Sequence, residues 1–228
     1  MKVTTDACLF AAWVAEEIKN DPDSYREKIN NCLDMGTGTG LLGLMVAQKN
    51  PKIKIDAIEI DKDAAEQAKI NVGSSPWKEQ INIIETDVKD FSFEKEFDLI
   101  ISNPPFYENE IRSATDSKNV AHHSENLTLK ELLAIIKENL SEPGSFFLLL
   151  PYKRNEEIKK LLKDQPLHIS KMILVRQSVK HDYFRIFIKG SLNAEEKETE
   201  FDELSIWDDK QQYTNEFVTL LKDYYLHL

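Results

Sequence analysis

Short apolar runs alternate with amphipathic stretches along most of the chain. The runs that could form buried strands occupy residues 32–34, 53–60, 81–84, 97–101 and 146–150. Apolar residues at helical spacing predict intervening helices at residues 41–48, 63–72 and 127–140. Strands that alternate with helices are typical of βαβ units, in which helices cover both faces of a parallel sheet. The pattern therefore predicts an α/β domain.

A helix is predicted to open the chain. Leu9, Trp13 and Ile18 recur at roughly helical spacing after Asp6, so we expect a helix over residues 7–18 with Asp6 as its N-cap. The 228 residues suffice for one large core, and α/β sheets of this length commonly form one domain. We therefore expect a single domain.

The C-terminal part follows a different pattern. Residues 169–175 and 183–189 look like strands joined by a short polar connection, and we expect them to end the sheet as an antiparallel pair. Residues 192–209 are strongly acidic and have few apolar positions, which indicates a mostly solvated connector. A final helix is predicted over residues 213–226.

Charge and cysteine content restrict the partners and the compartment. Asp and Glu number 40 against 29 Lys and Arg, which gives a formal net charge of −11. This charge opposes nonspecific capture by nucleic acid or by an anionic membrane, so a polyanionic partner would need a local basic patch. Cys8 and Cys32 lie inside apolar runs, which fits a reducing compartment. With no membrane-spanning run or signal sequence, we expect a cytoplasmic protein.

A glycine loop, LDMGTGTG at residues 33–40, joins a predicted strand to a predicted helix. Glycines at this position let the backbone approach a ligand closely. The third glycine comes one residue earlier than in the dinucleotide fingerprint, and the Asp34 carboxylate would repel a pyrophosphate, so a ligand with a cationic part is favoured. Glu59 follows the loop by about 20 residues, where an acid binds a ribose diol. Alternatively, Asp34 caps the turn and Glu59 is a solvated strand end.

A stiff corner, SNPPF at residues 102–106, ends the run at 97–101. Pro104 and Pro105 fix the backbone, so the Pro104 carbonyl and the Asn103 amide oxygen can face one spot as two acceptors. Two acceptors that hold both hydrogens of an exocyclic amine stabilise the positive charge that develops when the nitrogen attacks. Phe106 offers a flat face for a substrate ring. The alternative is an ordinary turn with a buried Phe.

Together the two motifs resemble those of class I S-adenosylmethionine-dependent amino-methyltransferases. Three further segments resemble one family of these enzymes, the bacterial tRNA1(Val) (adenine(37)-N6)-methyltransferases. They are MKVTTDACLFAAW, NPPFYENEIRSATDSKNVAHHSENL and QYTNEFVTLLKDYYL. The similarity covers nearly the whole chain and is weakest in the acidic connector and the strand pair before it. This chain begins directly at the Lys2 motif, without the short extension usual in the family.

The resemblance implies a Rossmann-like fold: a mostly parallel seven-stranded sheet, an antiparallel terminal strand pair and helices on both faces. Residues 1–22 would form a helix over the pocket, residues 23–190 the core, and residues 191–228 the acidic connector and C-terminal helix. The implied activity is methyl transfer from S-adenosyl-L-methionine to N6 of adenosine 37 in tRNA. The implied partner is the anticodon stem-loop, bound by a monomer without membrane or DNA partners.

The resemblance also implies roles for individual residues. The implied catalytic corner comprises Asn103, Pro104, Pro105 and Phe106. The implied cofactor-binding residues are Lys2, Thr5, Asp34, Gly36, Thr37, Gly38, Gly40, Glu59, Ile60, Asp87, Val88 and Asn103. The candidate substrate contacts are Asp6, Phe106, Arg112, His122, His123, Lys180, His181 and Arg185.

Basic residues on loops at the pocket mouth could form a rim that binds RNA. Lys180, His181 and Arg185 belong to this predicted rim, although each could equally be a scattered solvated charge. The adjacent His122 and His123 favour a polar surface or an RNA contact over a metal ligand pair, so no metal is expected.

Other functions are weighed against this one. Glutamine methylation of a release factor and amine methylation of a ribosomal RNA base use a similar corner, but the flanking segments favour tRNA. A non-catalytic cofactor-binding or RNA-binding module would need a degraded motif. A nicotinamide oxidoreductase is disfavoured by the glycine spacing.

Overall fold

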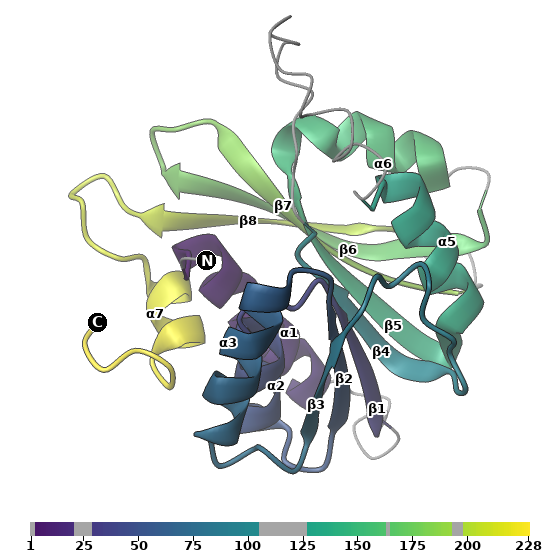
Figure 1. Ribbon diagram of the computed structural model, residues 1–228. Coiled ribbons are helices and arrows are strands. Elements are labelled where there is room, and N and C mark those ends of the chain that lie inside the picture. The colour runs from purple at the N-terminus through teal and green to yellow at the C-terminus, as the bar shows by residue number, and fades with distance from the viewer. Residues whose placement is uncertain (1–2, 21–28, 105–126, 163–164, 193–197) are drawn as a thin grey trace, which may run out of the picture.

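A computed structural model describes residues 3–20, 29–104, 127–162, 165–192 and 198–228 of the chain. Its centre is an eight-stranded sheet of order β3-β2-β1-β4-β5-β7-β6-β8 (Figure 1). The strands are β1 (Asn31–Met35), β2 (Lys54–Glu59), β3 (Ile81–Glu85), β4 (Phe97–Ser102), β5 (Leu140–Pro151), β6 (Leu167–Ser178), β7 (Tyr183–Leu192) and β8 (Glu200–Trp207). The helices are α1 (Thr5–Asn20), α2 (Leu41–Lys49), α3 (Lys62–Gly73), α5 (Leu129–Asn139), α6 (Asn155–Leu162) and α7 (Asn215–Leu221), with a 3₁₀ turn at Tyr152–Arg154.

Parallel pairing creates a crevice at one edge of the sheet. The first five strands run parallel, and β1 pairs with β2 on one side and with β4 on the other. The chain thus proceeds outward from β1 in one direction through β2 and β3, and in the other through β4 and β5. In open α/β sheets, ligands bind beyond the carboxyl ends of the strands where the order reverses. The topology therefore places the ends of β1 and β4 beside one crevice.

The far part of the sheet corrects one expectation. Residues 192–209, predicted to be a solvated connector, contain β8, which pairs in parallel with β6. The antiparallel strands β6 and β7 are therefore internal, and the sheet has eight strands rather than seven. Leu204 and Ile206 of β8 are buried, whereas its acidic residues form ion pairs with β6, such as Glu203 with Arg176 at 3.2 Å. An edge strand with one packed face needs few apolar residues, which explains the missed strand.

Helices cover both faces of the sheet with separate apolar clusters. One cluster contains residues of α1, α2 and α7, and the other contains residues of α5 and α6 (Figure 1). In α1, Trp13 lies 5.2 Å from the Phe147 ring and 5.7 Å from the Phe187 ring, measured between ring centroids. These contacts fix the start of α1 above the carboxyl edge of the sheet.

The helices differ from the expectations in three respects. The first helix begins at Thr5, so Asp6 lies in its first turn and is not the N-cap. The last helix is shorter than predicted and begins after Thr214, whose hydroxyl accepts a 3.2 Å hydrogen bond from the Phe217 amide. The short helix α6, which follows β5, was not predicted.

Candidate active site

A pocket of about 1150 Å³ lies at the carboxyl edge of the parallel strands. Its lining comes from the start of α1, the loops after β1 and β2, the segment after β3, and the residues that follow β4. This is the crevice that the reversal of strand order produces. The lining brings the predicted glycine loop, Glu59, Asp87 and Asn103 together in one site.

The glycine loop has the left-handed conformation that its sequence requires. Gly36 has φ +71° and Gly40 has φ +83°. A Cβ atom at Gly36 would meet nothing within 4 Å, so the backbone there faces open space, whereas one at Gly40 would contact Ala68 at 3.6 Å. Residues with a side chain rarely adopt these φ values, whereas glycine adopts them readily. The loop therefore turns tightly and leaves room for a ligand beside its backbone.

Glu59 at the end of β2 supports the glycine loop directly. One carboxylate oxygen accepts a 2.7 Å hydrogen bond from the Gly38 amide, and the other accepts a 2.9 Å bond from the Asp61 amide. Its side chain lines the pocket although only 7% of the residue is exposed. Each carboxylate oxygen has further acceptor capacity, so Glu59 can still accept from the hydroxyls of a ribose.

Asp34 lies behind the glycine loop and is absent from the pocket lining. Its Oδ2 atom accepts a 2.6 Å hydrogen bond from the Thr37 hydroxyl, while its buried Oδ1 atom has no partner in the described part of the chain. Burial raises the pKa of Asp34 to about 7. Asp34 thus holds Thr37, which lines the pocket, and the predicted contact of Asp34 with the cofactor stays a prediction.

The segment after β2 and β3 forms the other end of the pocket. Ile60 is 51% exposed, which is unusual for an isoleucine and offers an apolar surface inside the pocket. Asp87 and the buried Val88 also line the pocket. The Asp87 carboxylate accepts a 2.9 Å bond from the Lys89 amide. An apolar face with an adjacent acceptor suits an adenine ring and its amine.

Asn103 and Pro104 follow β4 directly and line the same pocket. The corner is tied to the neighbouring strand by the Ser102 hydroxyl, which donates a 2.8 Å hydrogen bond to the Met35 carbonyl. Ser102 is fully buried, so this bond is protected from water. The remaining predicted residues Lys2, Pro105, Phe106, Arg112, His122 and His123 lie outside the described residues.

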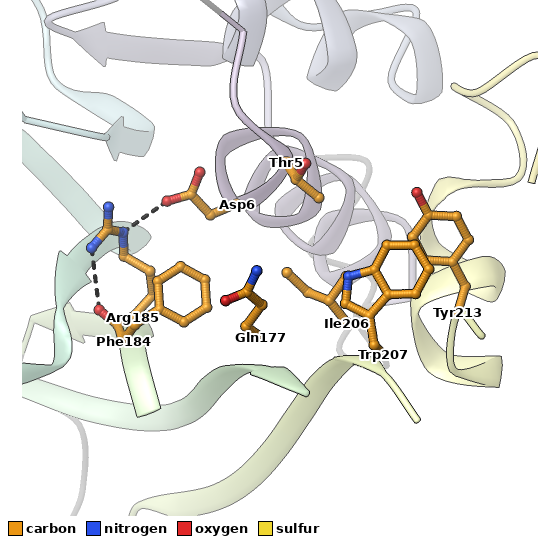
Figure 2. Close-up of a pocket in the computed structure, with 8 residues that line it drawn as sticks. All are labelled: Thr5, Asp6, Gln177, Phe184, Arg185, Ile206, Trp207 and Tyr213. Atoms are coloured by element: carbon orange, nitrogen blue, oxygen red, sulfur yellow. Dashed lines mark hydrogen bonds and ion pairs between the residues drawn. The ribbon is translucent and has the colours of Figure 1, made fainter. Parts of the chain in front are cut away.

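Asp6 and Arg185 join the first helix to β7 at the pocket wall. The Arg185 Nε atom donates to an Asp6 oxygen at 2.7 Å, as the dashed line in Figure 2 marks. Both residues line the large pocket. Thr5 lies beside a smaller neighbouring pocket instead, where Asp6 and Arg185 also contribute to the lining. The predicted cofactor contact of Thr5 therefore stays a prediction.

The predicted basic rim is spread along the sheet edge. Lys180 and His181 occupy the exposed turn between β6 and β7 and do not line the pocket, whereas Arg185 does. The His181 Nδ1 atom lies 2.6 Å from the Ser178 hydroxyl, and Lys180 Nζ donates to the Asp209 carbonyl at 3.4 Å. Because β6 runs parallel to β4 and β5, this turn still projects from the same edge as the pocket.

Several residues of α3 that were not predicted as site residues line the pocket. Asp63 and Gln67 line the pocket and are four positions apart. Helical residues at this spacing share one face, so the predicted helix and the adjacent Glu59 together contained a signal for them. Val3, Thr4, Leu127 and Leu149 reach the pocket only through tertiary packing, and no local pattern marks them.

The described ranges contain neither a metal-binding cluster nor a helix that could span a membrane. There, no group of three or more His, Cys, Asp or Glu residues is placed to hold a metal ion. No helix in those ranges is both long enough and apolar enough to cross a membrane.

Comparisons with solved structures agree with the fold. Solved structures with this fold include a protein described as a predicted O-methyltransferase from Agrobacterium tumefaciens, with TM-score 0.66, 16% identity and 95% of each chain covered. Another is an S-adenosylmethionine-dependent methyltransferase from Clostridium acetobutylicum, with TM-score 0.54, 16% identity, and 81% of this chain and 92% of that chain covered. The arrangement is therefore the Rossmann-like methyltransferase fold.

Proteins related in sequence identify the family within this fold. Residues 16–164 match the model of the methyltransferase small domain. The tRNA1(Val) (adenine(37)-N6)-methyltransferase of Yersinia enterocolitica is 33% identical over all of this chain and 87% of its own length. The enzyme of that name from Flavobacterium johnsoniae is 34% identical over all of this chain and 94% of its own. The chain is an S-adenosylmethionine-dependent methyltransferase, and it belongs to the family of tRNA1(Val) (adenine(37)-N6)-methyltransferases.

Proposed function

We propose that the protein transfers a methyl group from S-adenosylmethionine to N6 of adenosine 37 in tRNA1(Val). The observation that carries this proposal is that Asn103 and Pro104 line the same pocket as the glycine loop and Glu59. An amine-binding corner and a nucleoside-binding loop thus face one space. Relatives that share the whole chain carry the name of this activity.

The residues of the pocket fit S-adenosylmethionine. The open space over Gly36 would accommodate the methionine part, and Glu59 would accept from the ribose hydroxyls. Ile60 would pack against the adenine, and Asp87 would accept from its amine. When bound, this cofactor supplies an electrophilic methyl group on a positively charged sulfur. The pocket is large enough for the cofactor and an adenine together, because ligand pockets of drug-sized molecules span roughly 300–1,000 Å³.

The stiff corner prepares the target amine for attack. The lone pair of an adenine amine is shared with the ring, so the nitrogen becomes nucleophilic as it turns toward tetrahedral geometry. The Asn103 amide oxygen and the Pro104 carbonyl accept its two hydrogens and stabilise the positive charge that grows on nitrogen. The Ser102 bond to Met35 ties the residue before this corner to β1, which helps to hold the two acceptors in place. One proton then leaves the methylated amine to solvent.

The target base reaches the pocket from a single-stranded loop. Adenosine 37 lies in the anticodon loop, and turning a base out of its stack costs a few kcal/mol. The acidic protein attracts this RNA through local contacts at the carboxyl edge, where Lys180, His181 and Arg185 lie. We take the active form to be a monomer in the cytoplasm, where tRNA is modified, that binds the anticodon stem-loop.

Incubation of the protein with labelled S-adenosylmethionine and a tRNA1(Val) transcript tests this function. Digestion to nucleosides is expected to give label only in N6-methyladenosine. A transcript with guanosine at position 37 serves as the control and is expected to accept no label. Label in another nucleoside, or equal label in the control transcript, would contradict the proposal.

A further inference from the structure

A second pocket continues the crevice along the sheet edge. It has a volume of about 370 Å³ and lies between the start of α1 and the ends of three strands. Gln177 comes from the end of β6, Phe184 from the start of β7, and Trp207 from the end of β8. Figure 2 shows the Phe184 ring, the Gln177 amide and the Trp207 indole in a row, with Thr5 and Asp6 opposite them. The proposed chemistry does not use this pocket.

The aromatic side chains of this pocket are held in fixed orientations. The Trp207 ring stacks on Tyr213 with centroids 4.1 Å apart, and Tyr213 stacks on Phe217 at 4.4 Å. Phe217 is fully buried, so the stack is anchored in the core. On the other side, the Arg185 guanidinium lies 5.2 Å from the centre of the Phe184 ring. The pocket therefore presents rigid planar surfaces.

Polar groups beside these rings are available to a ligand. Gln177 is exposed, and within the described residues its amide makes no hydrogen bond. Its side chain carries both a donor pair and an acceptor, which can match the edge of any nucleobase. Planar surfaces next to an amide are the features with which proteins recognise unstacked bases of single-stranded RNA.

The two pockets share a wall. Asp6 and Arg185 line both, and their 2.7 Å ion pair neutralises Asp6, the one acidic residue among the described residues that line the smaller pocket. The nucleotide next to a base bound in the larger pocket is therefore within reach of the smaller one. When that base turns out, its neighbour loses a stacking partner and gains from a new aromatic surface.

The position of this pocket in the sequence points to substrate recognition. All of its lining residues lie outside residues 16–164, the span that matches the general methyltransferase model. The tRNA methyltransferases, in contrast, align with the whole chain. We propose that the second pocket binds the base of the nucleotide next to the target adenosine, an inference that rests on the proposed function.

Abasic substitution combined with mutation tests the inference. Anticodon stem-loop RNAs are prepared with the base removed from the nucleotide on either side of the target. Loss of one of these two bases is expected to lower kcat/KM for the parent protein about tenfold, mainly through KM, as for the loss of one stacked base. Gln177→Ala and Phe184→Ala are each expected to lower kcat/KM on intact RNA. On that abasic RNA, each should lower kcat/KM by less than about twofold, because the contact with the base is already lost.

The controls separate binding from folding. Phe201→Ala removes an aromatic residue that is 61% exposed on β8 and lies outside both pockets, so it should leave methylation near the parental rate. Unchanged affinity for S-adenosylhomocysteine in all variants verifies the fold. If Gln177→Ala and Phe184→Ala lower kcat/KM as much on the abasic RNA as on intact RNA, or do not lower it on intact RNA, the inference is wrong while the proposed function stands. Failure of the parent to methylate intact RNA would overturn both.

Discussion

At the scale of single residues, the site depends on buried carboxylates more than on exposed ones. Glu59 holds the glycine loop through Gly38, and Asp34 holds Thr37 from behind. The sequence indicated both acids because each ends an apolar run beside the loop. It could not separate their roles, since the burial of Asp34 follows from how α2 packs over β1. Gly43 of α2 shows this closeness, because a Cβ there would lie 3.6 Å from the Asp34 carboxylate.

Removal of the Glu59 carboxylate should weaken cofactor binding. Glu59→Ala leaves the Gly38 and Asp61 amides without their acceptor and removes the contact to the ribose. We expect a loss of at least about tenfold in affinity for S-adenosylhomocysteine by calorimetry, since a hydrogen bond to a charged group contributes about 1.5–3 kcal/mol. Glu85→Ala is the matched control, because Glu85 pairs with Glu59 in the sheet register but does not line the pocket. Equal affinities in both variants would contradict this role.

The Asp34 carboxyl should make stability depend on pH. Burial raises its pKa from 3.8 to about 7 in the folded state, so the folded protein binds this proton more tightly than the unfolded chain. The contribution to stability is present at low pH and is lost as pH rises from 4 to 7. Between pH 6 and pH 8 it should fall by about 1 kcal/mol. Urea unfolding of the parent and Asp34→Asn at both values measures this change, and parallel pH profiles of the two proteins would disprove it.

At the scale of elements, the sequence predicted the βαβ part, the first helix and the antiparallel pair of β6 and β7, but it missed β8 and α6. The run 97–101 became β4 almost unchanged, because a strand buried on both faces is largely apolar. The edge strand β8 was missed because only alternate positions, Leu204 and Ile206, are buried. The second pocket depends on this strand, and no pattern within one segment could indicate it.

A core substitution in β8 distinguishes a packed strand from a connector. Leu204 is 5% exposed, so Leu204→Ala should lower the free energy of unfolding by about 2–5 kcal/mol. Phe201→Ala, at a position that is 61% exposed on the same strand, should change it by less than about 0.5 kcal/mol. Urea titrations compare the two variants. A small effect of Leu204→Ala would mean that this segment is not part of the folded sheet.

At the scale of the whole molecule, a protein of net charge −11 must bind a polyanion. Favourable contacts must then be local, and the candidate groups for them lie along one side of the sheet. The turn between β6 and β7, the end of β8 and the two pockets all lie at the carboxyl edge. The sequence predicted a basic rim from loop positions alone. It could not predict that Arg185 pairs with Asp6, because these residues meet only in the folded chain.

The exposed turn should contribute to the salt dependence of RNA binding. A double variant, Lys180→Ala with His181→Ala, should weaken tRNA binding severalfold and reduce the slope of log K against log salt by about 1. Lys52→Ala is the control, since Lys52 precedes β2 and so lies at the opposite edge of the sheet. Filter binding at several salt concentrations measures both quantities. An unchanged slope in the double variant would place the phosphate contacts elsewhere.

The central claim is that the corner after β4 stabilises the transition state of amine methylation. Single-turnover transfer of labelled methyl to tRNA1(Val), compared between the parent and Asn103→Ala, tests it most directly. We predict a rate at least about 100-fold lower in Asn103→Ala, as expected when one preorganised transition-state contact is lost, with a much smaller loss of affinity for S-adenosylhomocysteine. Asn82→Ala, an asparagine variant on β3 outside the pocket, should transfer at the parental rate. A near-parental rate in Asn103→Ala would contradict the account.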